Sequence, residues 1–377
     1  MIKRDLEQIL QPYLFKNKAI LIYGARQVGK TTLVHSLVRQ HKDQTLFLNG
    51  DEADVRDILS HASSTKLQPI IGQHKIVVID EAQRIPETGI LLKIIHDNFP
   101  GVQLIATGSS AFELANKTNE PLTGRKLEFT LFPVSFSEMV TFHGFLTEKR
   151  LIEHRMVYGT YPDIVSNPGM ENKFLKSLAS SYLYKDLLML EYIQKPVLLE
   201  KILKALALQV GSEISYNELS KLVNSDRGTV EKYVDLLEKA FIIFQLRGFN
   251  KNVRNEIKKG KKIYFYDNGI RNAIIGNFLP LTSRTDVGAL WENYIISERI
   301  KYNYNRDIDF NGYFWRTTQQ QEIDYVEDIN AELSAFEFKW NSGKKGFLSK
   351  TFAEAYPVKT FNTISPENIE TFLLNRD

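Results

Sequence analysis

The sequence predicts an α/β protein of several domains that begins with a parallel-sheet, nucleotide-binding domain. Three observations support this prediction. The chain has 377 residues, more than one ordinary domain holds. Strand-like and helix-like segments alternate over residues 1–130. A glycine-rich pattern of the kind that binds phosphate follows the first of the strand-like segments.

Four short apolar runs predict strands buried on both faces: 19–23, 45–49, 75–79 and 102–107. Helical patterns lie between them at 32–39, 54–60 and 89–98. Strands that alternate with helices in this way favour a parallel sheet.

The composition is that of a soluble globular protein, with 43% hydrophobic and 25% charged residues. The absence of cysteine excludes disulfides, thiolate metal sites and a cysteine nucleophile. The first residues lack an apolar signal region, and no apolar run approaches the roughly 18 residues that span a bilayer. We therefore expect a cytoplasmic protein. The net charge of +3 indicates no class of partner.

The phosphate-binding pattern G-x-x-x-x-G-K-[ST] is matched by Gly24-Ala25-Arg26-Gln27-Val28-Gly29-Lys30-Thr31. Its glycines let backbone N–H groups turn toward phosphates, and the following helix adds a partial positive charge. Lys30 would neutralise the β- and γ-phosphates. The Thr31 hydroxyl would bind Mg²⁺, with Thr32 beside it as a phosphate donor. The sequence thus predicts ATP and Mg²⁺ as ligands.

Two further strands of the predicted sheet end in polar side chains. Asp80 and Glu81 follow the third strand, at the edge where ligands of open α/β sheets bind. Asp80 would hold the magnesium through water, and Glu81 would orient the attacking water. The next strand ends in Thr107-Gly-Ser-Ser110. Either Thr107 or Ser109 would contact the γ-phosphate or the water, and the alternative is a plain helix cap.

Leu122-Thr-Gly-Arg125 offers an arginine able to stabilise charge in the transition state. It would act in its own subunit or in a neighbouring one, within a homo-oligomer. The alternative is an ordinary surface arginine.

The order of these motifs, with Leu131-Phe-Pro-Val-Ser-Phe136 and Tyr158-Gly-Thr-Tyr-Pro162 after them, resembles that of AAA-superfamily ATPases of bacteria and archaea. Those proteins carry a C-terminal domain of uncharacterised function. The resemblance implies an AAA-type P-loop ATPase core over 1–135, a helical connector over 136–195, a winged helix-turn-helix over 196–260 and a PD-(D/E)xK nuclease-like domain over 261–377. Thr160 departs from the family, which more often has glycine there.

Residues 213–246 have the order of a winged helix, with Thr229 to Ala240 as its recognition helix. That helix carries three acids and two lysines, a poor surface for a phosphate-lined groove. The stretch 247–262 is different, because it holds seven basic residues against the single acid Glu256: Arg247, Lys251, Arg254, Lys258, Lys259, Lys261 and Lys262. It would lie along a DNA backbone, or else be a solvated loop.

The C-terminal segment holds Asp324 near the end of one predicted strand and Glu337-Phe-Lys339 on the next. Strand alternation puts Glu337 and Lys339 on one face. This is the arrangement of PD-(D/E)xK nucleases. Asp324 and Glu337 would hold a second Mg²⁺ or a Mn²⁺, and Lys339 would assist the attacking water. Glu292 would add a carboxylate, in preference to Glu298. A surface hairpin that alternates charged and aromatic residues is the alternative.

Two functions fit these patterns. In the first, ATP binding and hydrolysis control a nuclease that acts on nucleic acid. In the second, the chain is a nucleotide-gated switch whose nuclease-like domain is catalytically inactive and binds a partner.

Overall fold

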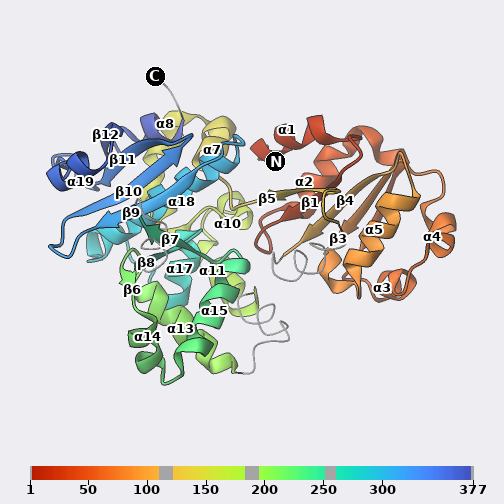
Figure 1. The fold of residues 1–377 in the computed structure, drawn as a ribbon, viewed down its shortest axis with the longest axis horizontal. Coiled ribbons are helices and arrows are strands. Elements are labelled where there is room, and N and C mark those ends of the chain that lie inside the picture. Colours follow the sequence, from red (N-terminus) through yellow and green to blue (C-terminus); the bar gives the residue numbers. More distant parts are fainter. Residues whose placement is uncertain (1, 110–121, 183–194, 251–259, 375–377) are drawn as a thin grey trace. The chain divides into compact units, whose positions relative to one another are not determined.

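The computed structural model describes residues 2–109, 122–182, 195–250 and 260–374 (Figure 1). The chain forms two compact units. The N-terminal unit comprises residues 3–133 with 239–241, and the C-terminal unit comprises residues 1–2, 134–238 and 242–377.

The N-terminal unit is built on a five-stranded sheet in the order β2-β3-β4-β1-β5. Every pair in it is parallel. The strands are β1 (Ala19–Tyr23), β2 (Thr45–Asn49), β3 (Ile76–Asp80), β4 (Gln103–Gly108) and β5 (Lys126–Thr130). The predicted parallel sheet is confirmed. Strand β5 was not predicted, because its residues are half-buried and partly charged and show no apolar run.

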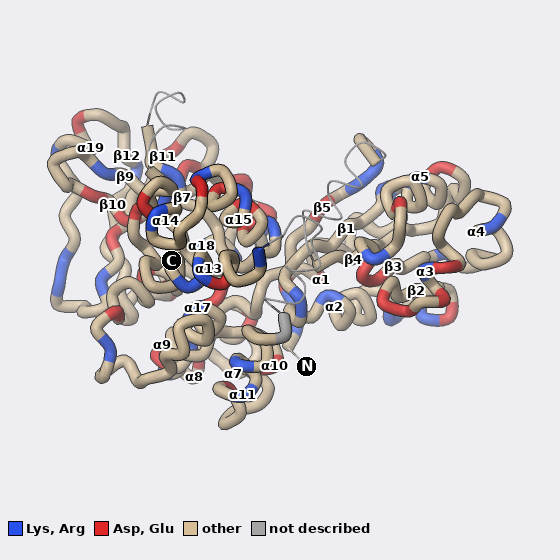
Figure 2. Tube along the Cα trace, turned by 90° about the horizontal axis from the view of Figure 1, so that it is seen from below, with Lys and Arg blue, Asp and Glu red and all other residues tan. Residues whose placement is uncertain are grey.

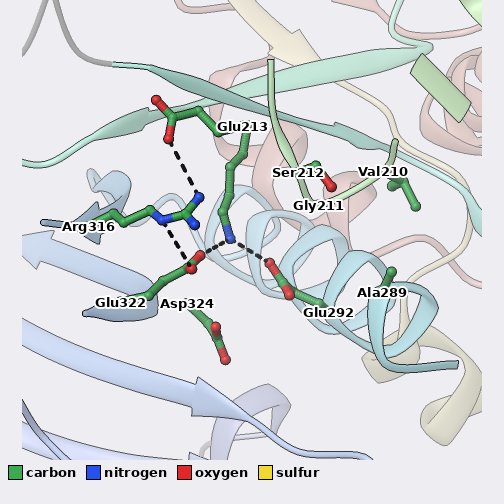
Figure 3. A pocket seen from close by; sticks show the side chains of 10 residues that line it. Val210, Gly211, Ser212, Glu213, Ala289, Glu292, Arg316, Glu322 and Asp324 are labelled. Atoms are coloured by element: carbon green, nitrogen blue, oxygen red, sulfur yellow. Dashed lines mark hydrogen bonds and ion pairs between the residues drawn. The ribbon is translucent and has the colours of Figure 1, made fainter. Parts of the chain in front are cut away.

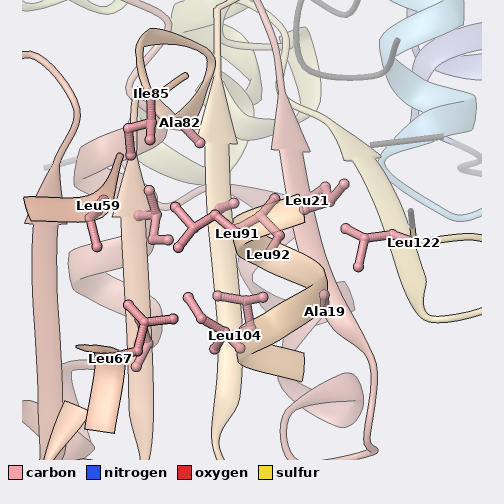
Figure 4. Close-up of a cluster of buried hydrophobic side chains, with 14 of the residues drawn as sticks. Ala19, Leu21, Leu59, Leu67, Ala82, Ile85, Leu91, Leu92, Leu104 and Leu122 are labelled. Carbon is pink, nitrogen blue, oxygen red and sulfur yellow. The ribbon is translucent and has the colours of Figure 1, made fainter. Parts of the chain in front are cut away.

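The described helices of this unit are α1 (Asp5–Leu10), α2 (Lys30–Leu37), α3 (Ala53–Leu59), α4 (Ser64–Ile71) and α5 (Thr88–Asn98). Helices α3, α4 and α5 share a hydrophobic core with the strands. Figure 4 shows leucines of α4 and α5 packed against strand residues such as Leu104. Helix α4 was not predicted, and Pro69 inside it interrupts the usual helical pattern. Burial of these apolar faces holds the sheet edge that carries the predicted phosphate site.

The C-terminal unit begins with short helices: α7 (Phe136–His143), α8 (Phe145–Arg150), α9 (Ile152–Tyr158), α10 (Pro162–Ser166) and α11 (Glu171–Ser177), then a short π-helix over Leu178–Tyr182. Gly159 after α9 makes room for Asp267, whose carboxylate would lie 2.0 Å from any Cβ at that position. Asp267 accepts a hydrogen bond from the Thr160 amide at 2.7 Å. This contact fixes the Tyr158–Pro162 motif to the body of the unit.

A seven-stranded sheet forms the body of this unit, in the order β12-β11-β10-β9-β7-β8-β6. Its strands are β6 (Glu213–Ile214), β7 (Ile243–Gly248), β8 (Lys261–Phe265), β9 (Asn311–Arg316), β10 (Glu322–Ile329), β11 (Glu332–Phe338) and β12 (Val358–Ile364). The predicted boundary between 260 and 261 does not interrupt the sheet. Strand β8 pairs with β7 and β6 from the preceding segment, and β7 pairs with β9 from the following one.

The other helices of this unit are α13 (Pro196–Leu208), α14 (Tyr216–Val223), α15 (Arg227–Lys239), α17 (Asn268–Ile275), α18 (Val287–Tyr304), α19 (Lys350–Ala355) and α20 (Ile369–Leu373). The predicted order of helix, turn, helix and strand over 213–246 is present as α14, α15 and β7. Within the described residues, no helix is both long and apolar enough to cross a membrane.

Candidate nucleotide site and carboxylate pocket

The loop between β1 and α2 has the backbone that phosphate binding needs. Gly24 has φ +150°, and a Cβ there would lie 2.1 Å from the Leu131 carbonyl oxygen. Gly29 has φ +95°, in the left-handed region that favours glycine. Helix α2 begins at Lys30, whose Nζ donates to the carbonyls of Gly24 at 3.0 Å and Ala25 at 3.1 Å. The lysine therefore lies over the loop and is 4% exposed.

Asp80 is the centre of the hydrogen-bonded group at the carboxyl edge of the sheet. Its carboxylate accepts from the Thr31 hydroxyl at 2.7 Å and from the Thr107 hydroxyl. Thr107 in turn accepts from the Glu81 amide at 3.1 Å. The residues come from three places in the chain, α2, β3 and β4, and the parallel sheet brings them together. Thr107 thus touches both acidic residues directly.

The carboxylate of Glu81 is oriented by a residue that the site prediction left out. Gln83 donates to it at 2.6 Å and also to the Ser109 hydroxyl at 2.9 Å. The backbone of Glu81 has φ +49°, a left-handed conformation that is uncommon for a residue with a side chain. Gly50, at the end of β2, packs against this turn, since a Cβ there would lie 2.5 Å from the Glu81 carbonyl oxygen.

Arg4 is a second residue that the sequence prediction missed. Its guanidinium donates to the Val28 carbonyl in the phosphate loop at 2.8 Å and to the Phe132 carbonyl at 2.6 Å. It is 8% exposed. An arginine close to the start of the chain carries no local signal for this contact. It ties the loop to the segment after β5.

Arg125 lies away from this group within its own unit. The strand register pairs Ala19 with Lys126 and Tyr23 with Thr130. Arg125 therefore precedes the amino end of β5, whereas the phosphate loop follows the carboxyl end of β1, about 16 Å along the strands. Its guanidinium bonds to Asp97 at 2.9 Å. This geometry does not favour the alternative in which Arg125 acts on its own subunit's nucleotide, and the alternative of a neighbouring subunit stays a prediction.

In the C-terminal unit, Asp324, Glu337 and Lys339 lie together. Lys339 Nζ is 2.6 Å from Glu337 and 3.7 Å from Asp324, and the Phe338 amide donates to Asp324 at 2.8 Å. The pairing of β10 with β9 is irregular between Ile323 and Val326, and Asp324 lies within this irregularity. Burial, together with the charge of Asp324, raises the pKa of Glu337 to about 7.

Glu292 of α18 faces the same region from the other side and lines a pocket of about 420 Å³ (Figure 3). It accepts from Tyr264 at 2.6 Å and pairs with Lys262 at 3.1 Å. Lys262 also pairs with Glu322 at 2.5 Å. The pKa of Glu292 is raised, because burial has a larger effect than the opposing charge of Lys262. The predicted carboxylate is thus in place, but it is already paired with a lysine.

The less favoured carboxylate, Glu298, has a structural role. It is 2% exposed, accepts from the Phe136 amide at 2.6 Å and pairs with Lys301 at 2.7 Å. In the ranges that the structure describes, no three His, Asp or Glu side chains are grouped so as to hold a metal ion. The second divalent metal therefore stays a prediction.

Much of the predicted basic stretch, with Lys251, Arg254, Lys258 and Lys259, lies outside the described residues. Lys262 does not belong to a solvated basic surface, because it is 3% exposed and ion-paired. Over α15, Arg227 pairs with Glu231 at 2.8 Å, and Asp226 caps the helix start. Lys and Arg lie among Asp and Glu along both units (Figure 2).

Comparison with known proteins places the first of these sites in a class. Residues 16–140 match a family described as an AAA domain. Residues 149–280 and 287–369 match two domains of unknown function, DUF8612 and DUF4143. The AAA match and the geometry of the phosphate loop together support an ATP-binding P-loop domain.

Two relatives that match most of the chain are named only as uncharacterised proteins. An uncharacterised protein of Haemophilus influenzae is 24% identical over 370 residues, which cover 91% of this chain and 88% of the relative. One of Mycobacterium tuberculosis is 24% identical over 345 residues, covering 90% of this chain and 74% of the relative. Among solved structures, Thermotoga maritima RuvB matches with a TM-score of 0.33 and 14% identity, over 68% of this chain and 95% of that one.

Proposed function

We propose that the protein hydrolyses ATP in its N-terminal unit. The observation that carries this proposal is the hydrogen-bonded group of Thr31, Asp80 and Thr107 beside the phosphate loop. A loop alone would support nucleotide binding. The hydrogen bond between Asp80 and Thr31 of the loop, with Glu81 next to Asp80, supports hydrolysis as well.

The residues present fit a magnesium ion, because a hydroxyl and a carboxylate oxygen face each other at 2.7 Å and both are hard oxygen ligands. Thr31, and Asp80 through water, would hold Mg²⁺. When bound, it would neutralise charge on the β- and γ-phosphates.

The protein's own groups would do the rest. On nucleotide binding, the Lys30 ammonium would leave the Gly24 and Ala25 carbonyls and bind phosphate oxygens instead. The backbone amides of the loop would donate hydrogen bonds to the other phosphate oxygens. Glu81 would orient and polarise the attacking water. Gln83 holds that carboxylate at 2.6 Å, so the water-positioning group is fixed before the nucleotide arrives.

Arg125 would act only in a neighbouring subunit, which requires a homo-oligomer. Arg125→Ala would then lower kcat in the assembled protein. Adding a Lys30→Ala partner, which still supplies Arg125, would restore activity to the variant's intact nucleotide sites. Absence of such rescue, with mixed assembly verified, would argue against the role in trans.

The direct test of ATPase function compares Lys30→Ala with the matched surface variant Lys359→Ala, whose side chain is 59% exposed. Lys30→Ala should lose ATP hydrolysis, and Lys359→Ala should keep it. ATP binding is measured on the same samples with a fluorescent nucleotide. If Lys30→Ala bound and hydrolysed ATP like the parent protein, the proposal would fail.

A second function concerns the C-terminal unit, which we propose to be a nuclease-like domain preceded by a winged helix. The succession α13, β6, α14, α15, β7 and β8 supports the winged helix. The proximity of Asp324, Glu337 and Lys339 supports the nuclease-like site. In an active nuclease, Mg²⁺ or Mn²⁺ would support cleavage of DNA or RNA, and Asp324→Ala would abolish it.

The alternative is a nucleotide-gated switch in which this domain binds a partner without cutting. The mixed charge of α15 and the lysine beside Glu292 favour it. ATPase and nuclease assays on one preparation, with and without DNA, separate the two. Cleavage with DNA-stimulated ATPase activity supports the nuclease, and ATP-dependent partner binding that survives Asp324→Ala supports the switch.

A further inference from the structure

The ion pairs around the pocket of Figure 3 form a chain from one wall to the other. Glu213 lies 3.8 Å from Arg316, Arg316 lies 3.8 Å from Glu322, and Lys262 lies between Glu322 and Glu292. The shortest of these ion pairs are those of Lys262, whose side chain is 4% exposed. Lys262 is therefore the buried cation in this row of ion pairs.

The position of Lys262 is fixed from several directions. It lies on β8, opposite Glu213 of β6 on one side and Leu246 of β7 on the other. Its ammonium lies 5.5 Å from the centre of the Phe314 ring. A strand paired on both edges leaves the backbone no freedom to withdraw the side chain. The ammonium is therefore held where it is, unlike that of a surface lysine.

The charge on Lys262 is equally fixed. Burial acts to lower its pKa, but Glu292 and Glu322 outweigh burial and raise the pKa to about 12. The ion pairs with Glu322 at 2.5 Å and with Glu292 at 3.1 Å therefore favour the charged form of the side chain.

We propose that Lys262 is the built-in cation of this carboxylate pocket and occupies the place that a divalent metal would need in order to use Glu292 as a ligand. A metal bound at roughly 2.0–2.6 Å from the Glu292 and Glu322 oxygens would stand close to the ammonium, and the like charges would repel. Glu292 is then paired with the lysine and accepts a hydrogen bond from Tyr264. Only Asp324 and Glu337 remain as candidate metal ligands of the nuclease-like site.

The inference concerns the chemistry of the C-terminal unit and does not depend on ATP hydrolysis, so its failure would leave the ATPase proposal intact. It predicts that removing the lysine creates a metal site. Nucleotide-free full-length protein is titrated with Mn²⁺ by calorimetry and electron paramagnetic resonance. Lys262→Met should bind one more Mn²⁺ than the parent protein, and Mn²⁺ should raise its Tm.

Two variants control this result. Lys359→Met makes the same replacement at an exposed ion pair and should gain no ion. The double variant Lys262→Met with Glu292→Gln should lose the gained ion. An equal number of bound Mn²⁺ in the parent and in folded Lys262→Met would overturn the proposal, as would persistence of the gained ion in the double variant.

Glu292→Gln in the parent protein tests the proposal even if Lys262→Met does not fold. Glutamine can still accept from Lys262 and Tyr264, so the variant should fold. The proposal predicts unchanged Mn²⁺ binding, because Glu292 binds no metal in the parent. Loss of one Mn²⁺ on this substitution would make Glu292 a metal ligand and refute the inference.

Discussion

Replacing Gly50 with alanine should impair catalysis from a position that does not touch the nucleotide loop. A Cβ at this position would lie 2.5 Å from the Glu81 carbonyl oxygen and 3.2 Å from that of Asp80, where ordinary contact begins at 3.4 Å. The turn that carries Asp80 and Glu81 must therefore move by about 1 Å, a displacement that can cost about 100-fold in rate.

We expect Gly50→Ala to lower kcat for ATP hydrolysis about 100-fold while KM for ATP changes little, because the phosphate loop itself is not displaced. Steady-state kinetics with a phosphate-release assay measures both constants. Gly288→Ala is the control, since a Cβ at Gly288 would meet nothing within 4 Å. A Gly50→Ala protein with the parent kcat would refute the reasoning, because the turn would then tolerate the displacement or lie outside the active site.

Three further predictions concern stability. Arg4→Met removes two charge-assisted hydrogen bonds to carbonyls and should destabilise the N-terminal unit by about 3 kcal/mol in urea denaturation; an unchanged midpoint would contradict this. Leu92→Ala empties a site that is 0% exposed and should cost about 2–5 kcal/mol, and a loss below about 1 kcal/mol would show that the core collapses around it. Burial raises the pKa of Asp286, but Arg284 and Arg271 outweigh it and lower that pKa to about 2. Its stabilisation, about 1–2 kcal/mol, is fully present above the ordinary pKa of 3.8 and is lost as pH falls through about 2, so Asp286→Asn should be less stable than the parent at pH 7, and the difference should narrow as pH falls to 2. A gap that stays constant down to pH 2 would argue against the ion pairs.

Local spacing was enough to predict which residues lie together in much of the candidate nucleotide site. The glycines and Lys30 lie within eight consecutive residues, and Asp80 directly ends a buried apolar strand. The contacts of Arg4 could not be predicted in this way, because local spacing says nothing about residues far apart in the sequence. They span 24 and 128 residues of sequence, and only the folded chain brings them together.

The C-terminal site illustrates a different limit. Strand alternation correctly placed Glu337 beside Lys339. It could not foresee that Lys262, counted with the basic stretch, turns inward between Glu292 and Glu322. The sign of a charge can be read from the sequence, but its exposure depends on partners at distant positions. Strand β12 was missed because it is an edge strand with largely exposed residues and little apolar pattern.

The measurement that tests the central claim most directly is single-turnover ATP hydrolysis by Glu81→Gln, with ATP affinity measured on the same protein. The side chain keeps its size, and the loop, Lys30 and Asp80 are untouched. We predict ATP affinity within about threefold of the parent and a hydrolysis rate about 100- to 1,000-fold lower. Hydrolysis at the parent rate with Mg²⁺ and ATP bound would contradict the assignment of Glu81, and with it the proposed ATPase site.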